Sequence, residues 1–340
     1  MNIRKLAALL IVLLFAVSLA GCGGGDKKPA AQTGGDSYII KIANWYAPEH
    51  PQNVSLNKFK EIVESKTQGK IKVQIFPNSQ LGSEETFIDS VKKGTVQMGV
   101  PGTMPSRDVP LIAIAEMPFL FTGWDHAQKV FTGPIGEEIA KDLISKAGVR
   151  NLAWTVNGMR VISSNKPLEK FEDLKGLRLR VPNVPYYLEM VKGFGGNPTP
   201  MALTELFNAL EQKVVDGQDN PYPTVRSAKF YEVQKYMLDT KHMFSPNLWI
   251  INEKFFQSLS KDFQQVVTDA AKEAAKFNWE ISVKKDAEDM KWLQENGVKI
   301  IIPDAKFRQQ LLESQKACWE WYYVKYPGSK ELAEKIRAVK

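Results

Sequence analysis

The feature that most constrains the fold of this 340-residue chain is an alternation of strand-like and helix-like segments that starts at Tyr38. Short runs with apolar side chains at every second position predict strands, and longer runs with an apolar stripe predict helices. The predicted strands are 38–45, 70–76, 96–100, 149–156, 159–163 and 177–181, and the predicted helices are 51–67, 83–93, 185–193, 203–213 and 261–296. This alternation predicts an α/β fold with mostly parallel sheets.

The last predicted helix is the longest. Its apolar side chains recur at steps of four and three, as at Phe263, Val267 and Ala270, until Gly297 ends the run. It would span roughly 50 Å, which is long enough to support two lobes. A chain of about 300 residues is also long enough for two lobes with separate cores.

The N-terminus has the three parts of an export signal. Arg4 and Lys5 precede an uncharged apolar run at 6–19, and small residues follow before Cys22. The apolar run is shorter than the roughly 20 residues of a membrane-spanning helix. The sequence Leu-Ala-Gly-Cys resembles a bacterial lipobox, so we expect residues 1–21 to be a lipoprotein signal peptide and Cys22 to be lipidated.

Residues 22–37 are rich in Gly, Lys and small polar residues, which predicts a flexible tether between the lipid and a folded body. The only other cysteine is Cys318, so we expect no internal disulfide. Cys318 itself is expected to be a small apolar residue in a late helix.

Composition disfavours several classes of protein. Loss of the signal peptide lowers the net charge from +7 to +5, and the remaining basic residues are scattered, so no nucleic-acid surface is predicted. The three histidines, His50, His126 and His242, lie in no metal-ligand motif, and no nucleotide-binding or hydrolase motif occurs. We therefore expect a protein that is not an enzyme and that holds no metal and no cofactor.

Three residues are candidates for binding an organic carboxylate: Arg160, Arg180 and Asn220. Guanidinium groups match a carboxylate in charge and shape. Spacing alone slightly favours solvated arginines, because Arg178 and Arg180 share one face of a predicted strand. However, Arg180 ends that strand just before a proline turn, where α/β sheets present ligand groups. Asn220 is expected on an irregular loop.

Five phrases between about residues 41 and 277 resemble one known family. They are IFPNSQLGSEETFIDSVKKGTVQM, NGMRVISSNKPL, LKGLRLRVPN, GGNPTPMALTELFNALEQKVVDGQDNP and KFYEVQKYMLDTKH. They are similar to the DctP-like solute-binding proteins of tripartite ATP-independent periplasmic (TRAP) transporters.

This resemblance implies a bilobed periplasmic-binding-protein-like fold. The first lobe would cover roughly 38–156, the second roughly 157–250, and the helix at 261–296 would span both. It also implies an extracytoplasmic protein that closes by hinge motion and delivers a small-molecule carboxylate to small and large membrane permease subunits. With the lipobox, we expect this protein to be lipid-anchored, and we expect it to be a monomer.

The resemblance implies roles for particular residues as well. Arg180 would form a bidentate pair with the substrate carboxylate, Arg160 would be a second carboxylate contact, and Asn220 a further ligand group. Relatives that bind dicarboxylates can carry lysine in place of Arg160. The other positions expected to face the ligand are Asn44, Glu84, Asn183 and Leu203. Trp45 could flank the pocket or belong to the core.

The ligand class is less constrained. Sialic-acid binders of the family have an acidic residue just after the strand at 96–100, where this chain has Pro101, Gly102 and Thr103. This departure favours a smaller sugar acid, such as a uronate or keto-gluconate, with Asn44, Trp45 and Glu84 available for hydroxyl groups. A C4-dicarboxylate or keto acid is the alternative. An enzyme acting on a carboxylate and a ligand sensor are alternatives from other classes.

Overall fold

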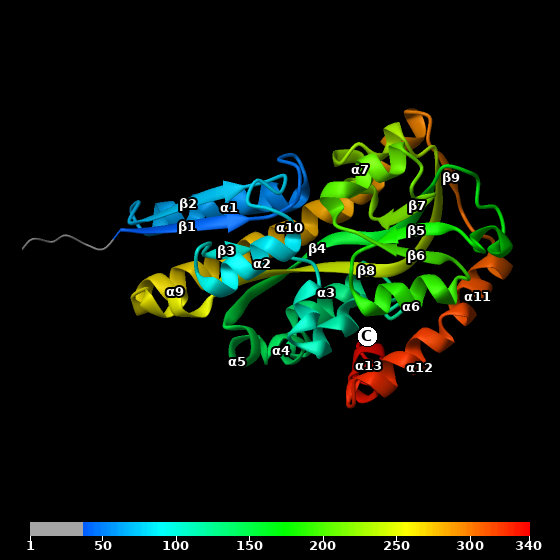
Figure 1. Ribbon diagram of the computed structural model, residues 1–340. Coiled ribbons are helices and arrows are strands. Elements are labelled where there is room, and N and C mark those ends of the chain that lie inside the picture. The colour runs from blue at the N-terminus through cyan, green and yellow to red at the C-terminus, as the bar shows by residue number, and fades with distance from the viewer. Residues whose placement is uncertain (1–36) are drawn as a thin grey trace, which may run out of the picture. The chain divides into compact units, whose positions relative to one another are not determined.

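The computed structural model describes residues 37–340, which form one compact body (Figure 1). The predicted signal peptide, Cys22 and almost all of the predicted tether lie outside the described residues. Among the described residues, no helix combines the length and hydropathy needed to cross a bilayer.

Nine strands of this body form one sheet in the order β2-β1-β3-β8-β4-β7-β5-β6, and β9 pairs with β8. The strands are β1 (Tyr38–Ala43), β2 (Ile71–Phe76), β3 (Met98–Gly99), β4 (Val149–Ser164), β5 (Arg178–Val181), β6 (Asn197–Pro200), β7 (Gly217–Asn220), β8 (Tyr236–Asn252) and β9 (Lys299–Ile301). The prediction of mostly parallel pairing holds where short strands pair with one another, as β1 does with β2 and β3, and β5 with β6 and β7. The long ladder between β4 and β8 is antiparallel, as are β3 with β8 and β4 with β7.

Helices surround this sheet. They are α1 (Pro51–Lys66), α2 (Glu84–Lys93), α3 (Trp124–Thr132), α4 (Pro134–Ala140), α5 (Leu143–Ala147), α6 (Pro185–Gly193), α7 (Leu203–Glu211), α8 (Tyr222–Ser227), α9 (Glu253–Ser258), α10 (Lys261–Glu295), α11 (Ala305–Ser314), α12 (Lys316–Lys325) and α13 (Ser329–Arg337). Four short 3-10 turns accompany them: η1 (Met104–Arg107), η2 (Pro110–Glu116), η3 (Phe171–Leu174) and η4 (Phe230–Glu232).

The two strands predicted at 149–156 and 159–163 are one continuous strand, β4. Asn157 and Gly158 suggested a break, but the ladder absorbs them as a register shift between Val156 and Gly158. Gly158 has a φ of 145°, which residues with a Cβ rarely adopt. The strand therefore continues without interruption to Arg160.

The predicted helix at 261–296 is confirmed as α10, which ends at Glu295. The Ser260 side chain caps its N-terminus by accepting the Phe263 N–H at 3.3 Å. Gly297 follows with a φ of 85°, which suits a helix end. α10 packs against α1, β4 and α8, and so contacts elements from both ends of the sheet.

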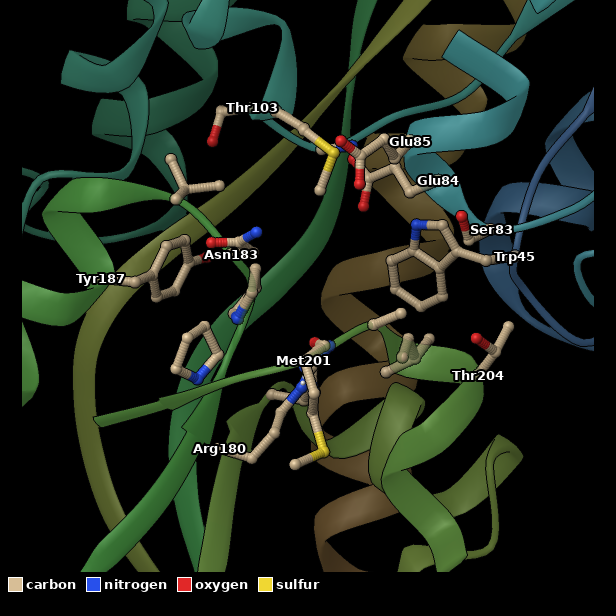
Figure 2. A pocket seen from close by; sticks show the side chains of 18 of the residues that line it. Trp45, Ser83, Glu84, Glu85, Thr103, Arg180, Asn183, Tyr187, Met201 and Thr204 are labelled. Carbon is tan, nitrogen blue, oxygen red and sulfur yellow. Dashed lines mark hydrogen bonds between the residues drawn. The ribbon is translucent and has the colours of Figure 1, made fainter. Parts of the chain in front are cut away.

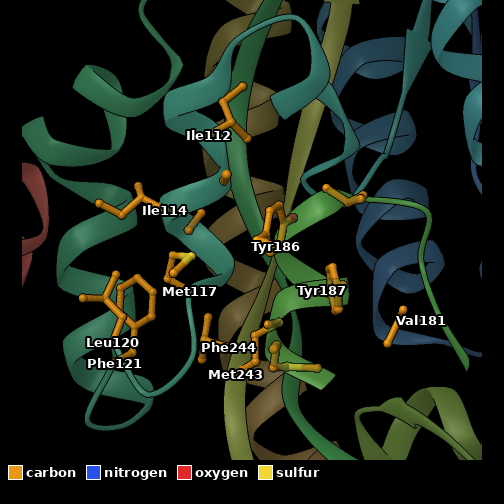
Figure 3. Packing of buried hydrophobic residues seen from close by; sticks show 14 of the residues in the cluster. Ile112, Ile114, Met117, Leu120, Phe121, Val181, Tyr186, Tyr187, Met243 and Phe244 are labelled. Atoms are coloured by element: carbon orange, nitrogen blue, oxygen red, sulfur yellow. The ribbon is translucent and has the colours of Figure 1, made fainter. Parts of the chain in front are cut away.

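Buried apolar side chains form three clusters. One joins β1, β2 and α1 to the first half of α10, and another joins α7 and α8 to its last turns. The largest packs η2, α3 and α6 against β4 and β8, and its members include Ile114, Met117, Phe121 and Phe244 (Figure 3). Cys318 is buried on α12 in the same cluster, as expected of a small apolar residue.

Candidate functional site

A cavity of about 280 Å³ opens where several strands of the sheet end (Figure 2). Segments far apart in the chain line it, from the end of β1 to the middle of β8. Its lining residues include Trp45, Ser83, Glu84, Thr103, Glu116, Arg160, Arg180, Asn183, Tyr187, Met201, Leu203, Asn220, Ser245 and Asn247.

Arg180 lies on β5 on the same face as Arg178, one pleat closer to the end of the strand. Arg178 is exposed and ion-paired with Asp216, whereas Arg180 is only 3% exposed. The Nε and Nη2 groups of Arg180 donate to the Met201 carbonyl at 3.0 and 2.7 Å. In the described chain, no acidic side chain lies within ion-pair distance of Arg180. Burial lowers the pKa of Arg180 to about 10; the Asp219 charge opposes this shift and the Arg160 charge adds to it.

Arg160 on β4 is different, because it already has a counter-charge. Its Nε donates to Asp219 Oδ2 at 2.6 Å, and its Nη2 donates to Asp219 Oδ1 at 3.1 Å. Its Nη1 donates to Ser245 Oγ at 3.3 Å. Burial would raise the pKa of Asp219, but the Arg160 guanidinium outweighs burial and holds that pKa well below its usual range.

Four glutamates line the same cavity: Glu85 and Glu205 are exposed, Glu84 is half-buried and Glu116 is buried. Glu84 is the first residue of α2, and its Oε1 accepts the Gly102 N–H at 2.8 Å. Glu116 ends η2 and is 3% exposed; its Oε1 accepts the Ser245 hydroxyl at 3.1 Å, and its Oε2 accepts the Tyr186 hydroxyl at 2.9 Å. Burial raises the pKa of Glu84 to about 7 and also raises the pKa of Glu116.

Aromatic rings complete the walls. The indole of Trp45 stacks on Tyr46 with ring centroids 3.6 Å apart, and the Tyr46 hydroxyl donates to Asn247 Oδ1 at 2.8 Å. Tyr187 lies across the cavity from Trp45 (Figure 2). Its ring centroid is 5.1 Å from Cζ of Arg160. The Trp45 Nε1 group is buried and has no hydrogen-bond partner within the described part of the chain.

The structure brings most of the predicted ligand residues together. Arg160, Arg180, Asn220, Glu84 and Trp45 all line the cavity, as do Asn183 and Leu203. Asn183 is exposed, and its carbonyl accepts Arg107 Nη2 at 2.7 Å.

Two expectations differ from the structure. Asn44 is fully buried outside the cavity, where its Nδ2 donates to Asn53 at 2.9 Å and its Oδ1 accepts the Tyr46 N–H at 2.9 Å. Its side chain is used to hold the end of β1 against α1. Asn220 is the last residue of β7 and not part of an irregular loop, because β7 pairs with both β4 and β5.

Several residues of the cavity were not predicted from the sequence, above all Glu116, Thr103, Tyr187, Ser245 and Asn247. One signal was available: Glu116 is the only charged residue in the apolar run 109–124, and a lone charge there is expensive to bury. Glu116 lies against Thr103, so it supplies a carboxylate beside the segment where the sequence lacks one.

The site contains little that could perform a reaction. Within residues 37–340, no group of three or more His, Cys, Asp or Glu side chains could hold a metal ion. His242 lies behind Asp219, with its Nε2 3.4 Å from Asp219 Oδ2, and burial lowers its pKa. The arrangement instead suits the binding of an anion that also carries hydroxyl groups.

Comparison with known proteins agrees with this interpretation. The family model described as bacterial extracellular solute-binding protein, family 7 (DctP) matches residues 42–325. The 2,3-diketo-L-gulonate-binding periplasmic protein YiaO of Escherichia coli is 35% identical over 252 residues, which cover 74% of this chain and 76% of that protein.

Two solved structures are similar over most of the chain. A TRAP periplasmic solute-binding protein from Haemophilus influenzae with bound L-gulonate has a TM-score of 0.87 and 37% identity, covering 89% of this chain and all of that one. The sugar-acid-binding protein DctPAm from Advenella mimigardefordensis in complex with galactonate has a TM-score of 0.86 and 32% identity, covering 89% of this chain and 98% of that one.

Proposed function

Because the chain belongs to the bacterial extracellular solute-binding proteins of family 7 (DctP), we propose that its cavity captures a sugar acid for a TRAP transporter. Family membership makes it an extracytoplasmic solute-binding protein and not an enzyme, with membrane permease subunits as the partners of its family. The identity of the solute is the part proposed.

The observation that carries the proposal is the buried, unpaired guanidinium of Arg180 in the cavity. A desolvated charge without a partner is costly, and a ligand carboxylate would supply the missing counter-charge. Arg180 would hold that carboxylate in a bidentate pair. Asn220 and the Nη1 edge of Arg160 would contribute further polar contacts.

The rest of the cavity suits the hydroxyl groups of a sugar acid. Glu84 and Glu116 offer carboxylate oxygens as acceptors, and Trp45 offers a flat apolar face beside them. Sugar acids are also what the similar proteins bind, namely L-gulonate, galactonate and 2,3-diketo-L-gulonate.

Arg180 variants test this proposal. Calorimetry should find micromolar or tighter binding of at least one acid among L-gulonate, D-galactonate, D-glucuronate and 2-keto-gluconate. Arg180→Lys should weaken it by about 10–100-fold, because the bidentate geometry is lost, and Arg180→Ala should abolish it. Arg178→Lys, on the same strand but facing solvent, should bind as the unaltered protein does. Unchanged affinity in Arg180→Lys would rule out the assignment of Arg180.

We also propose the domain organisation that the sequence suggests. Lobes at roughly 38–156 and 157–250, with α10 along both, would close around the ligand by hinge motion. Without ligand, closure would desolvate Arg180 with no counter-charge, so carboxylate binding and closure would be coupled.

Lipid anchoring through Cys22 is a further proposal, supported by the export-signal pattern and the small residues before the cysteine. Cells expressing the full chain should incorporate alkynyl palmitate into it and retain it in the membrane fraction. Cys22→Ser should lose both properties, whereas Cys318→Ser, at a buried position, should keep them. Labelling of the Cys22→Ser protein would refute the anchor site.

A further inference from the structure

Beyond the proposed sugar acid, on which this inference rests, we propose that the cavity selects acids with one carboxylate and rejects the corresponding diacids. The selecting groups would be Glu84 and Glu116, which face the end of the ligand that is remote from Arg180. Figure 2 shows Arg180 beside Met201 on one side of the cavity and Glu84 on the other.

The argument begins with the positive charges. Arg160 and Arg180 are the arginines that line the cavity within the described residues. The charge of Arg160 is neutralised by Asp219, which accepts hydrogen bonds from its Nε and Nη2 groups. Its Nη1 group donates to the Ser245 hydroxyl, which in turn donates to Glu116 Oε1. The hydrogen-bond acceptor of Arg180 among the described residues is the Met201 carbonyl, which carries no net charge. One guanidinium therefore remains for one ligand carboxylate.

The negative charges come next. Glu84 accepts a backbone N–H, and Glu116 accepts the hydroxyls of Ser245, Tyr186 and Thr103. These donors bring no positive charge. Burial raises the pKa of Glu116 against the opposing charge of Arg160, which is already paired with Asp219. No lysine or arginine forms an ion pair with Glu84 or Glu116 in residues 37–340. The remote end of the cavity is thus acidic and accepts hydrogen bonds.

This asymmetry distinguishes two kinds of ligand. A hydroxyl group can donate to a carboxylate oxygen, so the polyol end of a sugar acid is satisfied there. A second carboxylate has no proton to donate and would lie near like charges in a desolvated cavity. Between like charges a few ångströms apart, repulsion at intermediate dielectric should disfavour the diacid by about 100-fold or more.

Matched ligands test the inference. D-galactonate differs from galactarate only by oxidation of the remote hydroxymethyl group to a carboxylate. D-glucuronate differs from D-glucarate by oxidation of its remote C1, which also opens the sugar ring. Calorimetry of each pair should be done at pH 8, because the pKa of Glu84 is about 7 and its side chain is then ionised. The unaltered protein should prefer the monoacid by about 100-fold or more.

The isosteric variant Glu84→Gln should narrow this preference by about tenfold, mainly through tighter binding of the diacid. Glu116→Gln should act in the same direction and serves as an independent second variant, with circular dichroism checking that each variant is folded. Glu288→Gln removes the same charge from the exposed surface of α10 and should leave the ratio unchanged.

Each outcome has a separate meaning. If no acid of the panel binds, the proposed function fails. If monoacids bind and diacids bind equally well, the proposed function stands and the charge selection is overturned. If folded Glu84→Gln and Glu116→Gln proteins both keep the monoacid-to-diacid ratio of the unaltered protein, these glutamates do not select the ligand.

Discussion

At the scale of single residues, burial decides what an arginine can do. β4, β5 and β7 bring two Arg–Asp pairs close together along the sheet. Arg178 and Asp216 are partly exposed, whereas Arg160 and Asp219 are almost completely buried. The bonding pattern is similar in both pairs, yet the energetic consequences of breaking them should differ widely.

We expect Asp219→Asn to lower the free energy of unfolding by about 3–5 kcal/mol, because it leaves the buried Arg160 charge without its partner. Asp216→Asn should cost about 1 kcal/mol or less, since water can solvate Arg178. Urea unfolding at pH 7 measures both. Equal losses in the two variants would contradict the argument.

The pH dependence of the buried pair follows from the same contacts. The folded state lowers the pKa of Asp219, so the pair stabilises the fold above the usual aspartate pKa. Its contribution should be lost only as the pH falls through the lowered value, in strong acid.

At the scale of elements, the spacing between β4 and β7 positions Arg160 and Asn220. Gly217 lies where these strands touch, and a Cβ on it would be 2.2 Å from the carbonyl oxygen of Ser163. Because that atom belongs to the backbone of β4, no side-chain rotation can relieve the clash. The two strands would have to separate.

Gly217→Ala should therefore lower the free energy of unfolding by about 1–3 kcal/mol or more and weaken ligand binding, since Asn220 moves with its strand. Gly123→Ala is the control, because no atom lies within 4 Å of the added Cβ; its cost should stay within about 1 kcal/mol. Wild-type stability and affinity in Gly217→Ala would show that the strand spacing tolerates a side chain.

At the scale of the described body, α10 and the β4–β8 ladder connect the elements on either side of the cavity. Because these elements run continuously past the cavity, a hinge motion would have to bend them. No disulfide among the described residues opposes such bending. The energy to favour the closed state would come from the ligand carboxylate on Arg180.

Small-angle X-ray scattering of the protein lacking residues 1–36 should show a smaller radius of gyration when the best-binding sugar acid is added. Arg180→Ala should show no change with the same ligand. The forward scattering should give the mass of a monomer. An unchanged radius at saturating ligand would argue against closure, and a doubled mass against the monomer.

Ligand at about 100 times its dissociation constant should also stabilise the native protein by about 2.7 kcal/mol by mass action, which a thermal melt detects. This stabilisation depends on binding alone, so it separates a ligand that binds without closure from one that does not bind.

The sequence by itself determined the family and part of the local structure, although the longest strand, β8, was not predicted. Helical periodicity predicted α10, Gly297 predicted its end, and the phrases around Arg160, Arg180 and Asn220 indicated a carboxylate site. These features depend on residues near one another in the chain, so a local pattern carries them.

Only the tertiary structure decided how the charges of the site are distributed. Arg160 is not free for a ligand carboxylate because it is paired with Asp219, 59 residues away in the chain. Arg180 is free because its acceptor, the Met201 carbonyl 21 residues away, is neutral. In the sequence, Glu116 lies in an apolar segment, and nothing near it in the chain indicates its neighbours. In the structure it contacts Thr103 and Ser245 in the cavity. The physical reason is that burial and ion pairing depend on every element around a side chain, and no local pattern of residues specifies those neighbours.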